Sequence, residues 1–374
     1  MSYLLHTKYG SEEVNFSDWT FVENWNTSNV QNMEGLFTYC TGFTDMFNIN
    51  MSNVTNAENM YNSSSVVNLK SNIIGNKLQN AWGMFQNTNI EKVPDDASTL
   101  FGHNNNLTQV AHLFYNCTSL SYLGTHNVFT FEDDPTGMEP GEYKLDQTKL
   151  DNQLFTYCPN ITNMSGILHG CTSLGDIPMG LFYHCPNVQD VSGAFQQSAF
   201  TIPINPIYVC DVLLNNNLEI TTIASLFQRA NISGVLTENV ENGHFLFPSP
   251  KIQNANDVWN ACKMSDIQGY ENIPFVYKSK ELESINSMFA SQTAFRDLDA
   301  MFSEYNTYSW SNLATYCPKL SDASWLFYND TELIGNGNKL INELNKITTF
   351  GTHLGTFRNC TKLSDYNSIP SDWK

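Results

Sequence analysis

Apolar and polar positions follow one another in a fixed order along most of this chain. The order is clearest in residues 154–206, where LFTYCPNITNMSGILHGCTSLGDIP is followed by LFYHCPNVQDVSGAFQQSAFTIP. The two copies start at Leu154 and Leu181, and a weaker half-period divides each copy, at Ile167 and at Ala194. A fixed period of this length is typical of stacked repeats, in which each repeat contacts only its neighbours. We therefore expect an elongated solenoid that runs through most of the chain.

The residue pattern inside one copy predicts its local structure. Earlier copies carry their apolar pairs at the evenly spaced positions Leu36, Met60 and Met84. In the segment NMEGLFTYC, the apolar residues Met33, Leu36 and Phe37 have the spacing i, i+3, i+4, which favours two turns of helix. Ser and Asn residues before each pair supply turn and N-cap side chains. Each unit is thus predicted to contain a short extended segment, a turn and a short helix.

One small-residue position recurs in the repeat and contains most of the cysteines. Eight of the nine cysteines, all except Cys210, fall at this position, and other copies have residues such as Ser64, Thr88 or Asp330 there. A free cysteine packs as a small, weakly polar hydrophobe, so we expect buried thiols. Disulfides between stacked copies are the alternative. With the aromatic positions, the predicted repeat core comprises Phe37, Cys40, Phe114, Cys117, Phe155, Cys158, Cys171, Phe182, Cys185, Phe357 and Cys360.

The first residues carry no copy of the repeat. A repeat stack needs a terminal unit that closes the exposed end of its core. Phe16, Trp19 and Phe21 supply apolar material for such a unit. We predict an N-terminal cap at residues 1–21 and the solenoid at residues 22–374.

The other end of the repeat is predicted to need a cover as well. The chain ends at Lys374, soon after Cys360 and without a polar closing unit. An uncovered edge of this kind pairs readily with other chains. We expect either that Trp373 folds back over the last copy or that a partner chain covers it.

Two insertions interrupt the repeat, near residues 121–150 and 237–250. Insertions in solenoids tend to map to one face, often the face that binds a partner. The first insertion is acidic and lacks the ligand spacing of an EF-hand, so an ordinary solvated loop is the alternative interpretation. The candidate binding residues in the two insertions are Glu132, Asp133, Asp134, Phe245 and Phe247.

Composition and charge argue against several classes of partner. The chain has 374 residues, of which 41% are hydrophobic and 15% charged, so it has the apolar material for a large core. Its 18 basic and 37 acidic residues give a net charge of -19, which disfavours binding to phosphate backbones and anionic membranes. No apolar run approaches the roughly 18 residues of a membrane span. We expect no nucleic-acid partner and no membrane insertion.

No catalytic motif stands out in the sequence. It has no HExxH, GxSxG, Walker loop or GxGxxG, and its cysteines and histidines lack zinc-ligand spacing. We therefore predict a protein that is not an enzyme and uses no metal or cofactor. A polysaccharide-active solenoid enzyme is one alternative, because paired carboxylates depend on proximity in space. The 17 tyrosines and many asparagines are consistent with glycan binding, in which rings stack on sugar faces and amides bind hydroxyls.

The strings LFYNCTSL, LFYHCPNV, HGCTSLGDIP and WNTSNVQNMEGLF resemble the repeats of BspA-like leucine-rich surface proteins. The resemblance covers nearly the whole chain. It implies an α/β repeat solenoid, a leucine-rich-repeat-like stack of short strands and short helical turns with about 24–27 residues per repeat. Members of that family are mostly bacterial or protist surface proteins that adhere to host proteins, cells or other bacteria. Similar repeats also occur in tail and fibre proteins of phages of gut Bacteroidales.

The resemblance implies a non-enzymatic binding protein. The sequence has no signal peptide, cell-wall anchor or secretion tail, which favours a protein of the phage virion. We expect a structural or host-attachment protein, such as a tail, fibre or decoration protein, that recognises a cell-surface glycan or protein. Its further partners would be other virion or surface subunits, with a homo-oligomer as one arrangement. The alternative is a bacterial cell-surface adhesin expressed without its leader.

Overall fold

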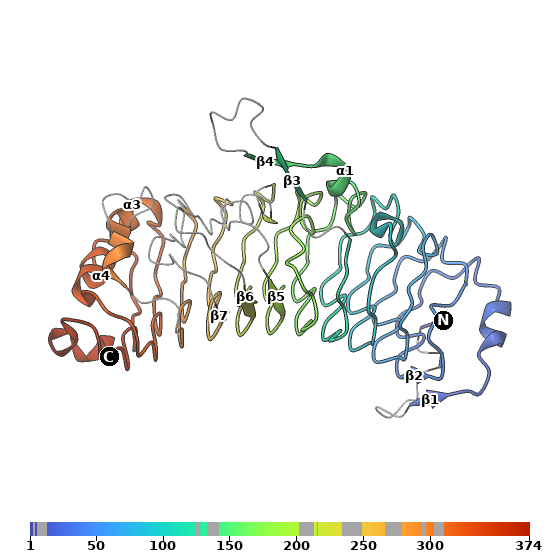
Figure 1. The fold of residues 1–374 in the computed structure, drawn as a ribbon, viewed down its shortest axis with the longest axis horizontal. Helices are drawn as coiled ribbons and strands as arrows, with labels where there is room; N and C mark the ends of the chain where they lie inside the picture. The colour runs from blue at the N-terminus through green and yellow to red at the C-terminus, as the bar shows by residue number, and fades with distance from the viewer. Residues whose placement is uncertain are drawn as a thin grey trace.

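The chain winds into a row of successive coils (Figure 1). In this computed structural model the described residues are 1–2, 4–5, 13–124, 128–132, 142–201, 213–214, 216–233, 249–265, 279–292, 297–302 and 310–374. Apolar side chains from all parts of the row belong to one continuous core. Each coil therefore buries its apolar residues against the coils before and after it.

Parallel backbone bridges join successive coils along one side of the row. The bridged residues are evenly spaced at Asn32, Asn56 and Asn80, whereas a far longer interval separates Gln109 from Asn163, because an insertion lies between them. Beyond it the shortest interval runs from Asn163 to Asp190, and most of the later ones exceed the expected repeat length. The complete ladder is Asn32, Asn56, Asn80, Gln109, Asn163, Asp190, Thr222, Asn254, Ser284, Asp322 and Thr352.

Regular strands are short in the described part of the chain. β1 (Val14–Asn15) pairs in parallel with β2 (Cys40–Thr41). A parallel sheet of three strands follows later in the row, formed by β5 (Ala199–Thr201), β6 (Asn231–Ser233) and β7 (Lys263–Ser265).

An antiparallel pair of strands stands out from the row (Figure 1). It consists of β3 (Phe129–Glu132) and β4 (Glu142–Leu145), and the short helix α1 (Gln147–Leu150) leads back to the coils. The other helices that the structure describes are η1 (Thr20–Asn24), η2 (Ala97–Thr99), η4 (Asp299–Phe302), η5 (Trp310–Asn312), α3 (Leu313–Tyr316), α4 (Gly337–Leu344), η6 (Tyr366–Ser368) and η7 (Ser371–Trp373).

Most segments around the apolar pairs are overlapping reverse turns and not the short helices that the sequence predicted, although α3 is a short helix at one such position. In the first coil, the Leu36 N–H donates to the Met33 carbonyl three residues back. The N–H groups of Gly35 and Phe37 instead donate to carbonyls of the next coil. An α-helix would use every N–H within its own segment. Because alternate N–H groups bond across to a neighbouring coil, the turn replaces the helix.

Within the described residues, eleven of these turns place two residues, four positions apart, in the left-handed region of backbone conformation. Such residues avoid a steric cost only when they are Gly, and Asn and Asp tolerate the conformation better than most others. This requirement explains part of the Gly and Asn content of the repeat. The pairs are Gly35 and Tyr39, Asn59 and Ser63, Gly83 and Asn87, His112 and Asn116, Gly166 and Gly170, Gly193 and Gln197, Ser225 and Arg229, Asp257 and Ala261, Ser287 and Ser291, Trp325 and Asn329, and Gly355 and Asn359.

Aromatic rings stack from coil to coil inside the row. The rings of Phe37 and Tyr61 have centroids 5.0 Å apart, and those of Phe85 and Phe114 are 5.8 Å apart. A second stack runs through Phe195, Phe227 and Trp259, and a third through Phe289, Phe327 and Phe357. Stacked rings bury large areas and add a specific attraction. All the residues that the sequence assigned to the repeat core are buried.

The cysteine position requires a small residue, and several of its side chains donate a hydrogen bond to the preceding coil. The eight cysteines that the structure describes are buried and free of disulfides. The Cys117 thiol donates to the Phe85 carbonyl of the preceding coil at 3.0 Å, and the Ser198 hydroxyl donates likewise to Leu168 at 2.5 Å. Burial without a positive partner raises the pKa of the Cys117 thiol to about 11. These cysteines are therefore packing residues in their protonated form.

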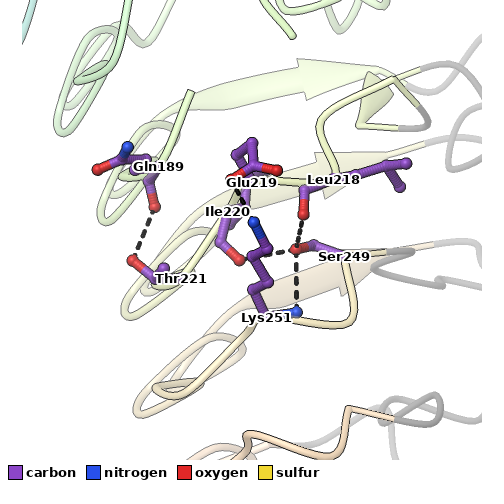
Figure 2. A network of polar contacts seen from close by, with 7 residues as sticks. All are labelled: Gln189, Leu218, Glu219, Ile220, Thr221, Ser249 and Lys251. Carbon is purple, nitrogen blue, oxygen red and sulfur yellow. Dashed lines mark hydrogen bonds and ion pairs between the residues drawn. The ribbon is translucent and has the colours of Figure 1, made fainter. Parts of the chain in front are cut away.

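Polar side chains also join the coils at the surface (Figure 2). The Thr221 hydroxyl donates to the Gln189 carbonyl of the preceding coil at 3.2 Å. The Ser249 hydroxyl reaches two carbonyls of its preceding coil, at 2.7 and 2.9 Å, and Lys251 pairs with Glu219. Exposed ion pairs contribute little, so these backbone-directed hydroxyls are the more important polar links.

Both ends of the row are covered by aromatic side chains. At the first coil, the Trp19 ring packs edge-on against Phe37 and Phe43, and its indole N–H donates to the Thr41 carbonyl at 2.9 Å. At the last coil, the Trp373 carbonyl accepts from the Phe357 N–H at 2.8 Å, where a further coil would otherwise bond. Of the two covers expected for the last copy, the structure has Trp373 folded back.

Candidate ligand-binding groove

The residues proposed from the two insertions are not assembled into a site by the described structure. Glu132 ends β3, and its backbone is paired with that of Glu142. Asp133, Asp134, Phe245 and Phe247 lie outside the described residues.

A groove of about 620 Å³ lies instead at the corners of four successive coils. Each of these corners carries a buried apolar pair, such as Phe155 or Phe182 with the leucine before it, and the residues that follow the pair face outward. The same local turn is repeated, so equivalent side chains gather in one column. The lining consists of His103, Asn105, Thr156, Tyr157, Pro159, Tyr183, His184, Pro186 and Asn216.

Aromatic rings form much of the groove wall. The His103 and Tyr157 rings are stacked, with centroids 3.9 Å apart and planes 26° from parallel. The Tyr183 and His184 rings meet edge to face at 5.1 Å. Tyr157 is 37% exposed, although it lies beside a buried core position. The wall therefore exposes to solvent part of an aromatic ring surface that is not required for core packing.

Hydrogen bonds hold this wall in place from behind. The His184 Nε2 lies 3.0 Å from the Leu150 carbonyl at the end of α1. The buried Asn217 amide donates to the carbonyls of Phe182 and Cys185 at 3.1 and 2.7 Å. A site whose side chains are held by such supporting bonds is organised before its ligand arrives. The contact with Leu150 also places the end of the insertion near 121–150 next to the groove.

The groove is uncharged in a strongly acidic protein. Among the described residues, its lining contains no Asp, Glu, Lys or Arg, although the chain carries a net charge of -19. The polar groups that remain are the amides of Asn105 and Asn216, the Thr156 hydroxyl, two phenols and two imidazoles. Aromatic faces pack on the C–H faces of sugar rings, while amides and hydroxyls bind their hydroxyl groups. The geometry suits a neutral, hydroxyl-rich ligand.

Sequence reasoning missed these residues because it looked for binding groups in the insertions. The available signal was the two variable positions that follow each Leu-Phe pair, where GH, TY and YH occur in the groove coils. Whether the side chains at these positions contact one another depends on which coils are neighbours. Thus His103 and Tyr157 are in ring contact although the whole insertion near 121–150 lies between them in the chain.

Within the described residues, no group of three or more His, Cys, Asp or Glu side chains is placed to hold a metal ion. None of the helices in that part of the chain has the length and apolar content needed to cross a membrane.

Comparison with known proteins gives one partial match. Residues 9–126 match the model of a family described as Mycoplasma protein of unknown function, DUF285. The match ends before most of the groove residues and covers less than a third of the chain. Searches of curated proteins and of solved structures found no match to this chain.

Proposed function

We propose that this chain is a non-enzymatic carbohydrate-binding protein of an adhesion or attachment assembly, built as a leucine-rich-repeat-type solenoid. The observation that carries the proposal is the groove: a wall of tyrosine and histidine rings with two amides and no charged side chain. The resemblance of the repeat strings to those of BspA-like surface proteins supports an adhesive role. The row of coils gives such a protein a long surface for repeated weak contacts, whose effects multiply when several engage together.

Removal of the two groove tyrosines tests this function directly. In a variant with Tyr157→Ala and Tyr183→Ala, we expect at least about a tenfold weaker affinity for bound oligosaccharide, because ring stacking is lost. The measurement is a printed array of bacterial and host oligosaccharides, followed by titration calorimetry of the strongest binder. Tyr328→Ala is the matched control, because this half-buried tyrosine lies on a later coil outside the groove.

Two results would contradict the proposal. One is equal oligosaccharide binding by the double variant and the parent protein, at equal thermal stability. The other is release of new reducing ends from a bound polysaccharide, which would favour the polysaccharide-active enzyme instead.

The assembly that we propose is a phage virion, in which the chain is an attachment or decoration protein; a bacterial cell surface is the alternative. The support is the likeness of the repeats to those of tail and fibre proteins. Mass spectrometry of density-purified particles beside the cell-envelope fraction separates the two. Intact chain at fixed stoichiometry in particles is the expected result, and its presence in the envelope fraction alone would favour the adhesin.

A further inference from the structure

A second group of aromatic rings lies on the turns of three successive coils, away from the groove residues. We call Trp82, His112, Tyr115 and His169 the ring row. The Trp82 and His112 centroids are 5.2 Å apart, those of His112 and Tyr115 are 5.1 Å apart, and Tyr115 stacks on His169 at 4.4 Å. All four rings are half-buried, so each combines packing with contact to solvent. They form one continuous aromatic strip across the coils.

The coil architecture does not require rings at these positions. The coil around Phe195 makes the same turn with Ser192, Gly193 and Gln196 where the coil around Phe114 has Ala111, His112 and Tyr115. Its N–H groups bond to the next coil in the same alternating pattern. The rings are therefore additions to a turn that folds without them.

Neighbouring residues keep the ring row in position. A Cβ atom at position 166 would lie 2.9 Å from the His112 ring. Gly166, which has no Cβ, therefore leaves space for this ring. His112 itself has a φ of 56°, a conformation that costs a non-glycine residue free energy. Gln196 hydrogen-bonds the His169 side chain from the following coil. The strip is held from both sides.

An amide ladder runs beside the rings on the same turns. The Asn87 amide donates to the Asn62 side-chain carbonyl at 3.4 Å, and the Asn116 amide donates to that of Asn87 at 3.1 Å. Each asparagine thus retains donor or acceptor capacity toward solvent. Rings flanked by amides are the same combination that lines the groove.

The rings and amides of this surface are themselves uncharged. Burial lowers the pKa of His112 and of His169, so both imidazoles are uncharged at neutral pH. The ring row and the amide ladder contain no carboxylate, ammonium or guanidinium group. The Asp190 carboxylate near His112 would repel an acidic ligand, whereas the faces of a neutral sugar can stack on the strip.

We propose that the ring row and the amide ladder form a second carbohydrate-binding platform, separate from the groove, that takes a neutral oligosaccharide chain. In the coil around Phe114, residues 104–111 separate the groove residue His103 from His112, so the two sites lie at different corners of the same coils. A polysaccharide long enough to reach both would be held at two points, which raises its apparent affinity without any new contact.

The test uses the full chain and a panel of neutral hexasaccharides of glucose, mannose, galactose and xylose. Trp82→Ala with Tyr115→Ala is expected to weaken binding of at least one hexasaccharide by about tenfold. Trp325→Ala with Tyr328→Ala is the matched control, because it removes an aromatic pair from the same kind of turn on another coil, outside the ring row. Thermal melting of each variant shows whether it is folded.

A fluorescence readout locates the bound sugar independently of affinity. Sugar binding to the parent protein should shift tryptophan emission, and this shift should disappear in Trp82→Phe but persist in Trp325→Phe. The groove variant with Tyr157→Ala and Tyr183→Ala should retain the Trp82-dependent shift even if the groove proves not to bind sugar. Wild-type affinity of the Trp82→Ala, Tyr115→Ala protein together with no Trp82-dependent shift would overturn the platform.

Discussion

At the scale of single residues, the buried small-residue position shows how the repeat tolerates different chemistries. Cys360 donates its thiol to the Phe327 carbonyl at 2.9 Å, which is the same use that Ser198 makes of its hydroxyl. Asp330 occupies this position in the coil before, where it is fully buried and its polar neighbour is the Gln292 backbone. Desolvation raises the pKa of Asp330 to about 9. A protonated acid therefore stands where other coils have a thiol or a hydroxyl.

Asp330 makes the stability of the protein depend on pH. Between the model-peptide pKa of 3.8 and the folded value of about 9, the folded state holds a proton that the unfolded state lacks. The free energy of unfolding must then fall as pH rises, by at most about 1.4 kcal/mol per pH unit from this group. Asp330→Asn removes the ionisation, so we expect a flatter stability curve and a gain in stability near pH 8. Chemical denaturation from pH 5 to 9 measures this.

Comparison of the two curves isolates Asp330 from other titrating groups. Cys360→Ser is a suitable control, since it keeps a small donor beside Asp330 and leaves the carboxyl in place. Parallel stability curves for the parent protein and Asp330→Asn over the whole range would show that the buried acid is not protonated in the fold.

At the scale of the structural element, the repeat unit is a chain of reverse turns locked to its neighbours. Replacing a left-handed glycine can lower the free energy of unfolding in two ways. One is the strain of the backbone angle, and the other is a clash of the new Cβ with a neighbouring atom. Gly166 has both, with a φ of 58° and a Cβ that would lie 2.9 Å from the His112 ring. Gly102 has a φ of 55° and open space around its Cβ.

Three glycine-to-alanine variants separate these costs. We expect Gly102→Ala to lower the free energy of unfolding by roughly 1–2 kcal/mol, the usual penalty of a left-handed alanine. Gly166→Ala should cost more, because the His112 ring must also move. Gly351→Ala should change stability by less than about 0.5 kcal/mol, because its Cβ meets nothing closer than 3.9 Å and its φ lies outside the left-handed region. Urea denaturation of the three variants gives the comparison, and equal losses for Gly102→Ala and Gly166→Ala would contradict the contact argument.

At the scale of the whole molecule, the row gains its stability from contacts between adjacent coils. In such an arrangement local opening begins where a coil has only one neighbour. The last coil is covered by Trp373, which is only 4% exposed and whose ring stacks on His353 at 4.1 Å and on Phe350 at 5.9 Å. The ends should therefore be the sites where single side chains control the extent of opening.

Trp373→Ala tests this dependence on the end of the row. We expect faster amide hydrogen exchange in residues 350–360. The substitution removes the indole ring that stacks on Phe357 and shields the backbone hydrogen bond from the Phe357 N–H to the residue 373 carbonyl. Exchange in the coil around Phe85 should stay unchanged, since coils are coupled chiefly to their neighbours. Hydrogen-exchange mass spectrometry measures both regions at once. Uniformly faster exchange along the chain would mean that the row unfolds as a single unit.

The sequence alone indicated the period of the early coils and the residues that recur at buried positions. This was possible because each coil must place apolar side chains between the same two neighbours, so Phe37, Cys40 and their equivalents repeat in register. The helix prediction for the turn segments was wrong for a physical reason. The spacing i, i+3, i+4 also serves a run of reverse turns, and only the bonds to the next coil distinguish the two.

The tertiary structure decided which side chains meet. His103 stacks on Tyr157, and Tyr115 stacks on His169, because the chain returns to the row after the insertion near 121–150. The same stacking of coils places Asp330 in an apolar position, where burial rather than sequence neighbours determines its protonation. The sequence specifies the aromatic and acidic residue types. Which of these side chains come into contact depends on which coils lie next to each other after the insertions.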